Sequence, residues 1–392
     1  MTDSSAYQWL SKSLQTIHQA NWYRAPQTIH SLPQNVVTID ERAIIMFASN
    51  NYLGLAGDAR LAAAAKSAID QYGTGATGSR LVSGHLPLHQ ELEAAIAQLK
   101  QTEAALVFSS GYLANLGTIS ALVGARDLVL GDSYNHACLK QGAALSGAKI
   151  HTYQHLDLVD LAHQLSAQRH LYRRCLITTD TVFSMDGDLA PLTEIMALAQ
   201  QYECMVLVDE AHGTGVFGHQ GGGLVQALGI SDSLIQVGTL SKALGSLGGY
   251  VAGSKELIDF LRNRASTWIY TTGLSPADTA AGLAALHIVQ TEPERRAQLW
   301  HNVRYLHQGL AELEPRFSLI AADSPILPLQ VGDIPRTLEI AASLKTAGIF
   351  APAIRPPTVP TARLRFTVMA THTQAHLDHL ISTLRNTLGD II

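Results

Sequence analysis

The sequence predicts an α/β protein with a large domain on a mostly parallel sheet and a smaller α+β lobe beside it. From about residue 55 to residue 255, strand-like apolar runs alternate with helical patterns, which is typical of parallel strands covered by helices on both faces. After residue 276 the pattern changes to long helices followed by a smaller α+β arrangement. Hydrophobic residues make up 47% of the 392 residues and charged residues 15%, so a large core is expected.

The elements follow in chain order from apolar spacing and from β-branched or apolar runs. A short amphipathic helix over 4–20 comes first, and two strand-like runs, NVVTID and AIIMFAS, follow it. The helices predicted next are 58–72, 88–100, 112–123, 136–146, 158–165 and 192–202. The strands predicted among them are 104–108, 127–132, 149–153, 173–182, 205–209, 234–240 and 248–253.

The C-terminal part has its own pattern. Helical character over 277–312 is interrupted at Glu292-Pro293, and a smaller α+β arrangement follows, with strands at 326–331 and 363–368 and helices at 335–347 and 372–388. We therefore expect a large α/β domain over 50–290 and a small α+β domain over 291–392. The N-terminal segment 1–49 is expected to join the small lobe.

Composition excludes several classes of function. A net charge of −5 gives no global basic surface, so nucleic acid is not an expected partner. Cys138, Cys175 and Cys204 stand far apart, which favours neither a disulfide framework nor a zinc site, and no other metal site is expected. The N-terminus lacks a signal-peptide pattern, and no apolar run is long enough to cross a membrane. A cytoplasmic location is the expectation.

The stretch MVLVDEAHGTGVFG (205–218) invites two interpretations that we set aside. Its glycines fit G-x-G-x-x-G, but acidic residues stand between strand and glycines, where a carboxylate would repel a pyrophosphate. A second match, over 73–78, follows a helical pattern and not a strand. The letters DEAH also suggest a helicase-like magnesium site, but that requires a phosphate cradle, and the sequence has no Gly-Lys dipeptide.

A third interpretation pairs an acid with a lysine. Asp209 ends one predicted strand, and Lys242, in VGTLSKALGSLGG, follows another. Small neighbours leave room for a cofactor around Lys242, although a lysine on a glycine-rich loop is more often an ordinary surface residue. An acid and a lysine at neighbouring strand ends form the arrangement that pyridoxal 5'-phosphate (PLP) requires, because the acid keeps the pyridine nitrogen protonated and the lysine binds the aldehyde.

Five ordered motifs resemble those of one enzyme family. The segments SNNYLGLA, SSGYLANLG, VFSMDGDLAPL, DEAHGTGVFG and TLSKALGSLGG are together similar to the α-oxoamine synthases, and the resemblance runs from about residue 20 to the C-terminus. It implies a PLP-dependent transferase of the aspartate aminotransferase-like fold (fold type I). Enzymes of this family condense an amino acid with an acyl thioester and release carbon dioxide.

The resemblance implies catalytic roles for four residues. Lys242 would bind the PLP aldehyde as a Schiff base, and Asp209 would pair with the pyridinium nitrogen. His212 would donate a hydrogen bond to the ring hydroxyl. His136, in DSYNHACL, would stack on the ring face opposite Ala211.

The resemblance also implies a phosphate site. The backbone N–H groups of Gly111 and Tyr112 would bind the phosphate at a helix start, with help from the helix dipole. Thr239 and Ser241, which precede Lys242, would add hydroxyl groups.

Further cofactor contacts are implied by two other segments. Ser184, in FSMDGD, would line the pocket near the ring hydroxyl. Thr271 or Thr272, in IYTTGLSP, resembles the segment that reaches the phosphate from a partner subunit, which implies a homodimer with shared sites. The alternative is that these threonines are ordinary strand residues.

The carboxylate of the amino acid needs a fixed cation. Arg365, in TARLRFTV, matches the carboxylate-binding arginine of the family, and an arginine can grip a carboxylate in two places. Strand alternation puts Arg363 on the same face, so spacing alone does not choose between them. Arg24 and Asn50 are the accompanying candidates.

Two features favour the member of the family that joins L-alanine to a pimeloyl thioester in biotin synthesis. The segment AIRPPTVP (353–360) is similar to that member, and it contains Thr358, a further candidate for substrate binding. Ser79 stands where a glycine-using relative carries threonine, so the smaller side chain leaves room for the methyl group of alanine. The acyl carrier, coenzyme A or acyl carrier protein, stays open. The alternatives are a relative from the threonine or haem routes and a non-catalytic subunit.

Overall fold

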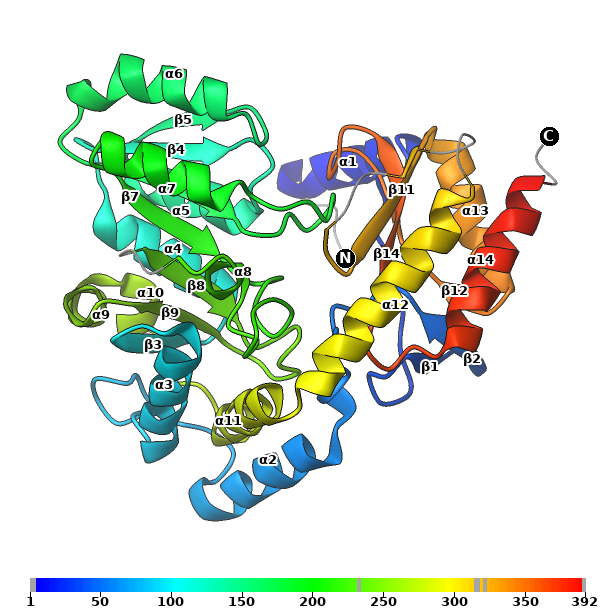
Figure 1. The fold of residues 1–392 in the computed structure, drawn as a ribbon, viewed down its shortest axis with the longest axis horizontal. Coiled ribbons are helices and arrows are strands. Elements are labelled where there is room, and N and C mark those ends of the chain that lie inside the picture. The colour runs from blue at the N-terminus through cyan, green and yellow to red at the C-terminus, as the bar shows by residue number, and fades with distance from the viewer. Residues whose placement is uncertain (1–4, 231–233, 314–317, 320–322, 390–392) are drawn as a thin grey trace.

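A computed structural model describes residues 5–230, 234–313, 318–319 and 323–389. Two lobes stand side by side in Figure 1, and the long helix α12 (Pro293–Ala311) runs from the large lobe into the small one. Part of the helix predicted over 4–20 lies outside the described residues, because residue 4 is not among them. Within the described residues, no helix is long and apolar enough to cross a membrane.

The large lobe is built on a seven-stranded sheet in the order β3-β9-β8-β7-β6-β4-β5. The pairs β4·β5, β4·β6, β6·β7 and β7·β8 are parallel, and only β9 runs antiparallel to its neighbours. This confirms the predicted α/β fold with a mostly parallel sheet. The strands are β3 (Ala104–Phe108), β4 (Leu128–Asp132), β5 (Lys149–Tyr153), β6 (Cys175–Asp180), β7 (Met205–Asp209), β8 (Ile235–Thr239) and β9 (Gly249–Gly253).

Apolar clusters on the sheet hold the covering helices in place. One cluster joins Leu106, Leu207 and Val251 to helix residues, and another joins Leu130, Ile177 and Val208 to a different set. Because both faces of the central strands are buried, those strands are almost continuously apolar. The helices of this lobe are α2 (Ala59–Tyr72), α3 (Pro87–Lys100), α4 (Gly111–Leu122), α5 (Ala137–Ser146), α6 (Leu158–Gln168), α7 (Leu192–Gln201), α8 (Leu224–Ala227), α9 (Lys255–Arg264), α10 (Ser266–Ile269) and α11 (Pro276–Thr291).

The small lobe combines both ends of the chain. Strand β2 (Arg42–Met46) pairs antiparallel with β1 (Val36–Ile39) and parallel with β12 (Ile349–Phe350), so N-terminal and C-terminal segments share a sheet. A second sheet has the order β10-β11-β14-β13. Its strands are β10 (Ser318–Leu319), β11 (Ile326–Gly332), β13 (Ala353–Ile354) and β14 (Ala362–Thr367), and the remaining helices are α1 (Gln8–Gln19), α13 (Ile334–Thr346) and α14 (Gln374–Gly389).

The short elements α8, α10, β10, β12 and β13 were not predicted, and two longer elements also differ from the prediction. The strand predicted over 173–182 is shorter, because β6 ends at Asp180 and Thr181 turns to donate its N–H to the Asp209 carbonyl at 2.9 Å. Helix α9 was not predicted, although Ser254 caps it by accepting a hydrogen bond from the Leu257 N–H. Its low content of apolar residues weakens the periodic signal, and only Ile258 and Leu261 are buried.

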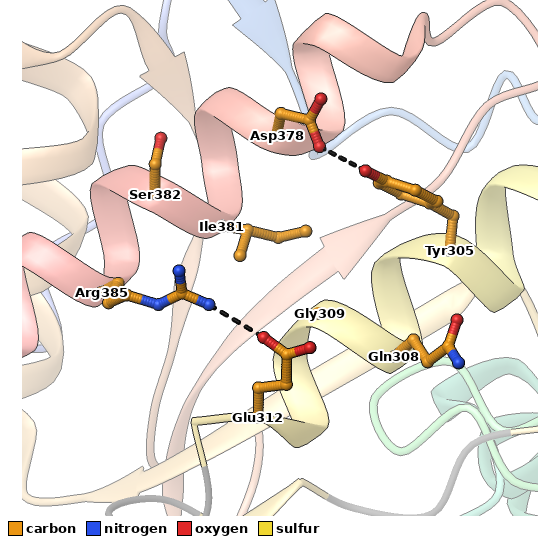
Figure 2. A pocket seen from close by; sticks show the side chains of 8 residues that line it. All are labelled: Tyr305, Gln308, Gly309, Glu312, Asp378, Ile381, Ser382 and Arg385. Carbon is orange, nitrogen blue, oxygen red and sulfur yellow. Dashed lines mark hydrogen bonds and ion pairs between the residues drawn. The ribbon is translucent and has the colours of Figure 1, made fainter.

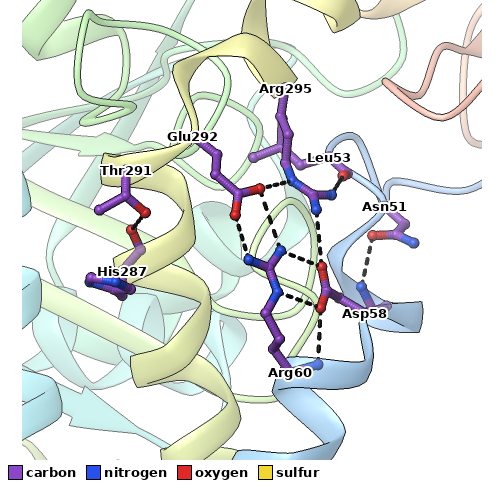
Figure 3. Close-up of polar contacts among 9 residues, drawn as sticks. Asn51, Leu53, Asp58, Arg60, His287, Thr291, Glu292 and Arg295 are labelled. Carbon is purple, nitrogen blue, oxygen red and sulfur yellow. Dashed lines mark hydrogen bonds and ion pairs between the residues drawn. The ribbon is translucent and has the colours of Figure 1, made fainter.

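An ion-pair network joins the lobes where α11 meets α12 (Figure 3). Asp58 caps α2 and pairs with Arg60 and Arg295, at 2.8 and 3.0 Å. Glu292 pairs with the same two arginines, and Arg295 also donates to the Leu53 carbonyl at 3.3 Å. These bonds lower the pKa of Asp58 and the pKa of Glu292 to about 2 each.

We expect Glu292→Gln to destabilise the protein by about 1 kcal/mol at neutral pH, since the pairs are partly exposed to water. A depressed pKa stabilises the fold above the ordinary value of 4.5, and the effect is lost as the pH falls through about 2. Denaturant unfolding across this range should show the two proteins converging in acid. The control is Asp259→Asn, which breaks an exposed pair with Arg262 and should change little. An equal effect of both variants would contradict the assignment.

Candidate active site

The predicted acid and lysine lie at the carboxyl ends of adjacent parallel strands. Asp209 is the last residue of β7 and aligns with Asp180 of β6 and Val237 of β8. Lys242 follows the end of β8 by three residues. Parallel strands place their carboxyl ends at one edge of a sheet, and this edge is where ligands bind in such folds.

Lys242 is tied to the domain core through His212. Its Nζ lies 2.8 Å from Nε2 of His212, and the other ring nitrogen, Nδ1, lies 2.7 Å from the Tyr52 hydroxyl. Burial lowers the pKa of Lys242, and burial followed by the charge of Lys242 lowers the pKa of His212 well below its ordinary value. Burial raises the pKa of Tyr52 to about 12. A neutral imidazole therefore links the phenol to the amine.

The carboxylate of Asp209 is buried and held from three sides. Its Oδ2 accepts a hydrogen bond from Asn115 Nδ2 at 2.7 Å and lies 3.8 Å from the Cys138 thiol. Its Oδ1 accepts from the backbone N–H of Ala211 at 2.8 Å. These contacts fix the orientation of the acid before any ligand binds.

A second carboxyl group, Asp180, stands beside Asp209. Its Oδ2 accepts a hydrogen bond from the His136 N–H at 2.7 Å, and its own N–H is held by Asn135. Burial, followed by the charge of Asp209, raises the pKa of Asp180 well above its ordinary value. Two adjacent buried carboxyls repel each other when both are ionised, which is the second cause of the raised pKa of Asp180.

His136 forms the N-cap of α5 and faces a cavity of about 790 Å³. Its Nδ1 lies 2.9 Å from the Cys138 thiol and 3.3 Å from the Cys138 N–H. Burial lowers the pKa of His136, while the charge of Asp209 opposes that shift. The contacts with Cys138 therefore hold the ring through Nδ1, and the residue also lines the cavity.

Glycines allow a close approach between α4 and the sheet. A Cβ on Gly111 would lie 3.1 Å from the Thr239 Cβ, and one on Gly249 would lie 2.3 Å from the Gly111 nitrogen. The first-turn N–H groups of a helix have no partner within the helix, so Gly111 and Tyr112 present theirs at this end. The Thr239 hydroxyl donates to the Gly248 carbonyl at 2.8 Å and accepts from the Ser241 N–H at 3.1 Å.

The structure separates the two arginines of β14. Arg363 forms an ion pair with Asp186, so its charge is already compensated. Arg365 donates to the Ser184 carbonyl at 2.5 Å and to Asn50 Oδ1 at 3.3 Å, which are both neutral groups. The distinction between them, which spacing left open, comes from their partners.

Some predicted site residues lie apart from Lys242. Arg24 donates to the Thr358 hydroxyl at 3.3 Å, beside a hollow of about 130 Å³ that shares Thr358 with the larger cavity. Ser79 forms an isolated antiparallel bridge with Thr272. Thr271 and Thr272 line a small hollow with Ser109.

His155 joins the two loops that border the cavity. Its Nδ1 lies 2.9 Å from Asp132, at the end of β4, and its Nε2 lies 2.9 Å from Asp188, in the loop after β6. The ring stacks on Tyr134 at 4.2 Å and meets Phe183 edge-on at 4.5 Å. Although burial opposes the charged form, the two carboxylates outweigh it and raise the pKa of His155 to about 9.

Tyr52, Asn115 and Asp180 were not among the predicted site residues. Tyr52 and Asn115 lie within two of the quoted motifs, SNNYLGLA and SSGYLANLG, and Asp180 stands two residues before a third, VFSMDGDLAPL. One signal was available: Asn115 is a polar residue one turn after Gly111 in a mostly apolar helix. For Asp180, no local pattern distinguishes it from other strand-end acids.

A separate surface groove lies between α12 and α14 in the small lobe (Figure 2). Tyr305 donates to Asp378 across it, and Arg385 pairs with Glu312 at 2.9 Å. It contains none of the residues at the carboxyl ends of the large sheet. Within the described parts of the chain, no group of three or more His, Cys, Asp or Glu residues could hold a metal ion.

Comparison with known proteins agrees with this geometry. Residues 42–384 match the model of the family "Aminotransferase class I and II". A protein of Rippkaea orientalis, provisionally named 8-amino-7-oxononanoate synthase, is 62% identical over 97% of this chain and 99% of its own length. A protein of Nostoc punctiforme with the same provisional name is 61% identical over 97% of both chains.

Solved structures give the same result. A serine palmitoyltransferase of Sphingomonas wittichii superposes with a TM-score of 0.90, 31% identity and 98% coverage of both chains. An 8-amino-7-oxononanoate synthase of Francisella tularensis superposes with a TM-score of 0.75 at 29% identity, covering 89% of this chain and 98% of its own. A serine palmitoyltransferase of S. paucimobilis, solved with a bound PLP-myriocin aldimine, has a TM-score of 0.89 at 31% identity, covering 98% of this chain and 99% of its own.

These findings define an acyltransferase of the PLP-dependent, fold type I class, as the resemblance implied. The chain belongs to the α-oxoamine synthase family, and it is about 60% identical to members provisionally named 8-amino-7-oxononanoate synthase.

The residues present fit such a cofactor. A buried acid, a half-buried lysine and a buried histidine between the lysine and Tyr52 supply the required donor set. Close packing at Gly111 and Gly249 leaves backbone N–H groups at a helix start, where an anion is favoured. Lys242 would hold the aldehyde, Asp209 the ring nitrogen and Gly111 the phosphate.

We expect His155→Leu to destabilise the protein by roughly 2 kcal/mol at about pH 6, where the imidazolium bridges both carboxylates. A raised pKa stabilises the fold below the ordinary value of 6.5, and this contribution is lost as the pH rises through about 9. Unfolding in urea at about pH 6 and about pH 10 measures the difference. A destabilisation that is the same at both values would show that only packing was lost.

Proposed function

We propose that this chain binds PLP and joins L-alanine to a pimeloyl thioester, giving 8-amino-7-oxononanoate, carbon dioxide and the free thiol for biotin synthesis. The observation that carries the proposal is that Asp209 and Lys242 lie at adjacent strand ends. The chain is also about 60% identical to proteins bearing that provisional name. A cytoplasmic location belongs to the same proposal. So does the division into 1–49, 50–290 and 291–392.

When bound, PLP supplies an electron sink that makes the Cα proton of the amino acid acidic. The chain supplies Lys242 as the base and Asp209 as the carboxyl group that would face the ring nitrogen. Burial favours the neutral amine of Lys242, which is the form that accepts a proton. Asp209 is oriented by Asn115 and Ala211, so its negative charge stays directed at one point.

The substrate groups meet other residues of this chain. Arg365 has neutral partners only, so its charge remains available for the carboxylate of L-alanine, with Asn50 beside it. His136 faces the cavity and would orient the thioester carbonyl with its free ring edge. Arg24 and Thr358, joined by a hydrogen bond near the same cavity, complete the substrate candidates.

The proposal includes a homodimer with shared sites, and the residues that lie apart from Lys242 support it. Ser79 and Thr272 pair with each other and, among the described contacts, neither is hydrogen-bonded to Lys242 or His212. We place this pair, with Thr271, in the site of a partner subunit, where Thr271 or Thr272 would reach the cofactor phosphate. Ser79 would then limit the space beside the amino acid.

The proposal is tested by turnover of the purified protein with PLP, a pimeloyl thioester and one amino acid. L-alanine should release thiol and carbon dioxide, and glycine and L-serine should each give less than about a tenth of that rate, since one small group discriminates by this order. Lys242→Ala should lose turnover and the visible absorption band of bound PLP. The control is Lys255→Ala, at an exposed lysine, which should retain both the turnover and the absorption band of bound PLP.

Faster turnover with L-serine and a long-chain acyl thioester would replace this proposal with the activity named for the Sphingomonas relative. The high structural similarity to that protein makes serine the comparison to include. Binding of PLP without turnover of any amino acid would favour a non-catalytic subunit.

A further inference from the structure

Two adjoining hollows extend from His136 to the surface of the large lobe. The cavity of about 790 Å³ reaches from His136 to a rim formed by Ser133, Tyr134 and Lys140. A second hollow of about 460 Å³ is lined by Ser133, Tyr134, Thr152, Tyr153, Gln154 and His155. Ser133 and Tyr134 belong to both linings, so the two hollows meet along this rim.

Lys140 is the one lysine or arginine among the residues that line the larger cavity. It lies on α5, whose N-cap is His136, and both residues line the same cavity. Its Nζ donates to the Ser133 carbonyl at 2.7 Å, and an ammonium group has two further donors. No carboxylate of the described residues lies within ion-pair distance of it, and the side chain is exposed.

The rim beside Lys140 is held rigid. Tyr134 stacks on His155 at 4.2 Å, and its backbone N–H donates to Asp132 at 2.7 Å. The His155 side chain is itself fixed by Asp132 and Asp188. An aromatic ring and a free ammonium group therefore border one opening at fixed positions, which lowers the entropic cost of binding a ligand there.

A thioester that reacts beside His136 has two arms, and only one of them can end inside the cavity. The thiol arm must leave through the opening, because the carrier at its far end is larger than the cavity. Coenzyme A and acyl carrier protein both present that arm as phosphopantetheine, a chain with amide groups whose phosphate joins it to the rest of the carrier. Lys140 is the cation that such a phosphate meets at the rim.

We propose that Lys140 binds the phosphate of the phosphopantetheine arm and that the Ser133–Tyr134 rim guides its amide chain. This inference rests on the proposed function for the identity of the substrate, but it concerns a separate binding event. It assigns Lys140 to the phosphate of the phosphopantetheine arm, which coenzyme A and acyl carrier protein share.

The test measures dissociation constants of 4'-phosphopantetheine and of pantetheine, which lacks the phosphate, for the purified protein supplied with PLP. The phosphorylated ligand should bind about fivefold more tightly to the natural protein, the ratio expected of an exposed ion pair. Lys140→Met should abolish this ratio without changing pantetheine binding. The control is Lys149→Met. Lys149 is exposed at the start of β5, whereas the end of β5 lines the second hollow, so this variant should preserve the ratio.

Added salt should reduce the phosphate-dependent ratio in the natural protein and have little effect in Lys140→Met, because screening acts on the ion pair. Repeating the comparison with coenzyme A and with acyl carrier protein shows which carrier uses the site. A ratio that survives in Lys140→Met, or equal binding of the two ligands to the natural protein, would overturn the inference. Failure of pimeloyl turnover alone would overturn the proposed function and leave these binding constants to decide the role of Lys140.

Discussion

Parallel pairing of β6, β7 and β8 is the constraint on which the rest of the site depends. It places Asp180 beside Asp209 and brings Lys242 to the same edge of the sheet. The burial that follows has chemical consequences, because it lowers the pKa of Lys242 and raises the pKa of Asp180. Asp209, oriented by Asn115 and Ala211, is the carboxyl group that would meet a protonated ring nitrogen in the proposed function.

The links between the lobes extend this constraint to the substrate side. Arg365 on β14 reaches the Ser184 carbonyl in the loop after β6, and Arg363 pairs with Asp186 in the same loop. His155 fixes the other end of that loop through Asp188. The loop after β6, which borders the cavity, is therefore bonded to both β14 and His155. These bonds limit the movement of the groups that line the cavity.

The sequence allowed the fold class and most elements to be predicted, because alternating apolar runs and helical periods are local signals. The family motifs likewise identified Lys242, Asp209 and His212 as candidates. Other features depend on pairing across the fold. Tyr52 lies 160 positions from His212 and touches it only after folding, and nothing local marks Asp180 as the partner of the His136 backbone. The choice between Arg363 and Arg365 also required the position of Asp186.

The most direct test of the account is to locate the lysine that binds PLP. The protein is incubated with PLP, reduced with borohydride and digested, and the labelled peptide is identified by mass spectrometry. The account predicts a single label on Lys242. Lys100, a buried lysine, lies 3.7 Å from Glu210 and donates to the Gly222 carbonyl, so it should stay unlabelled. A label on Lys100, or none on Lys242, would contradict the assignment.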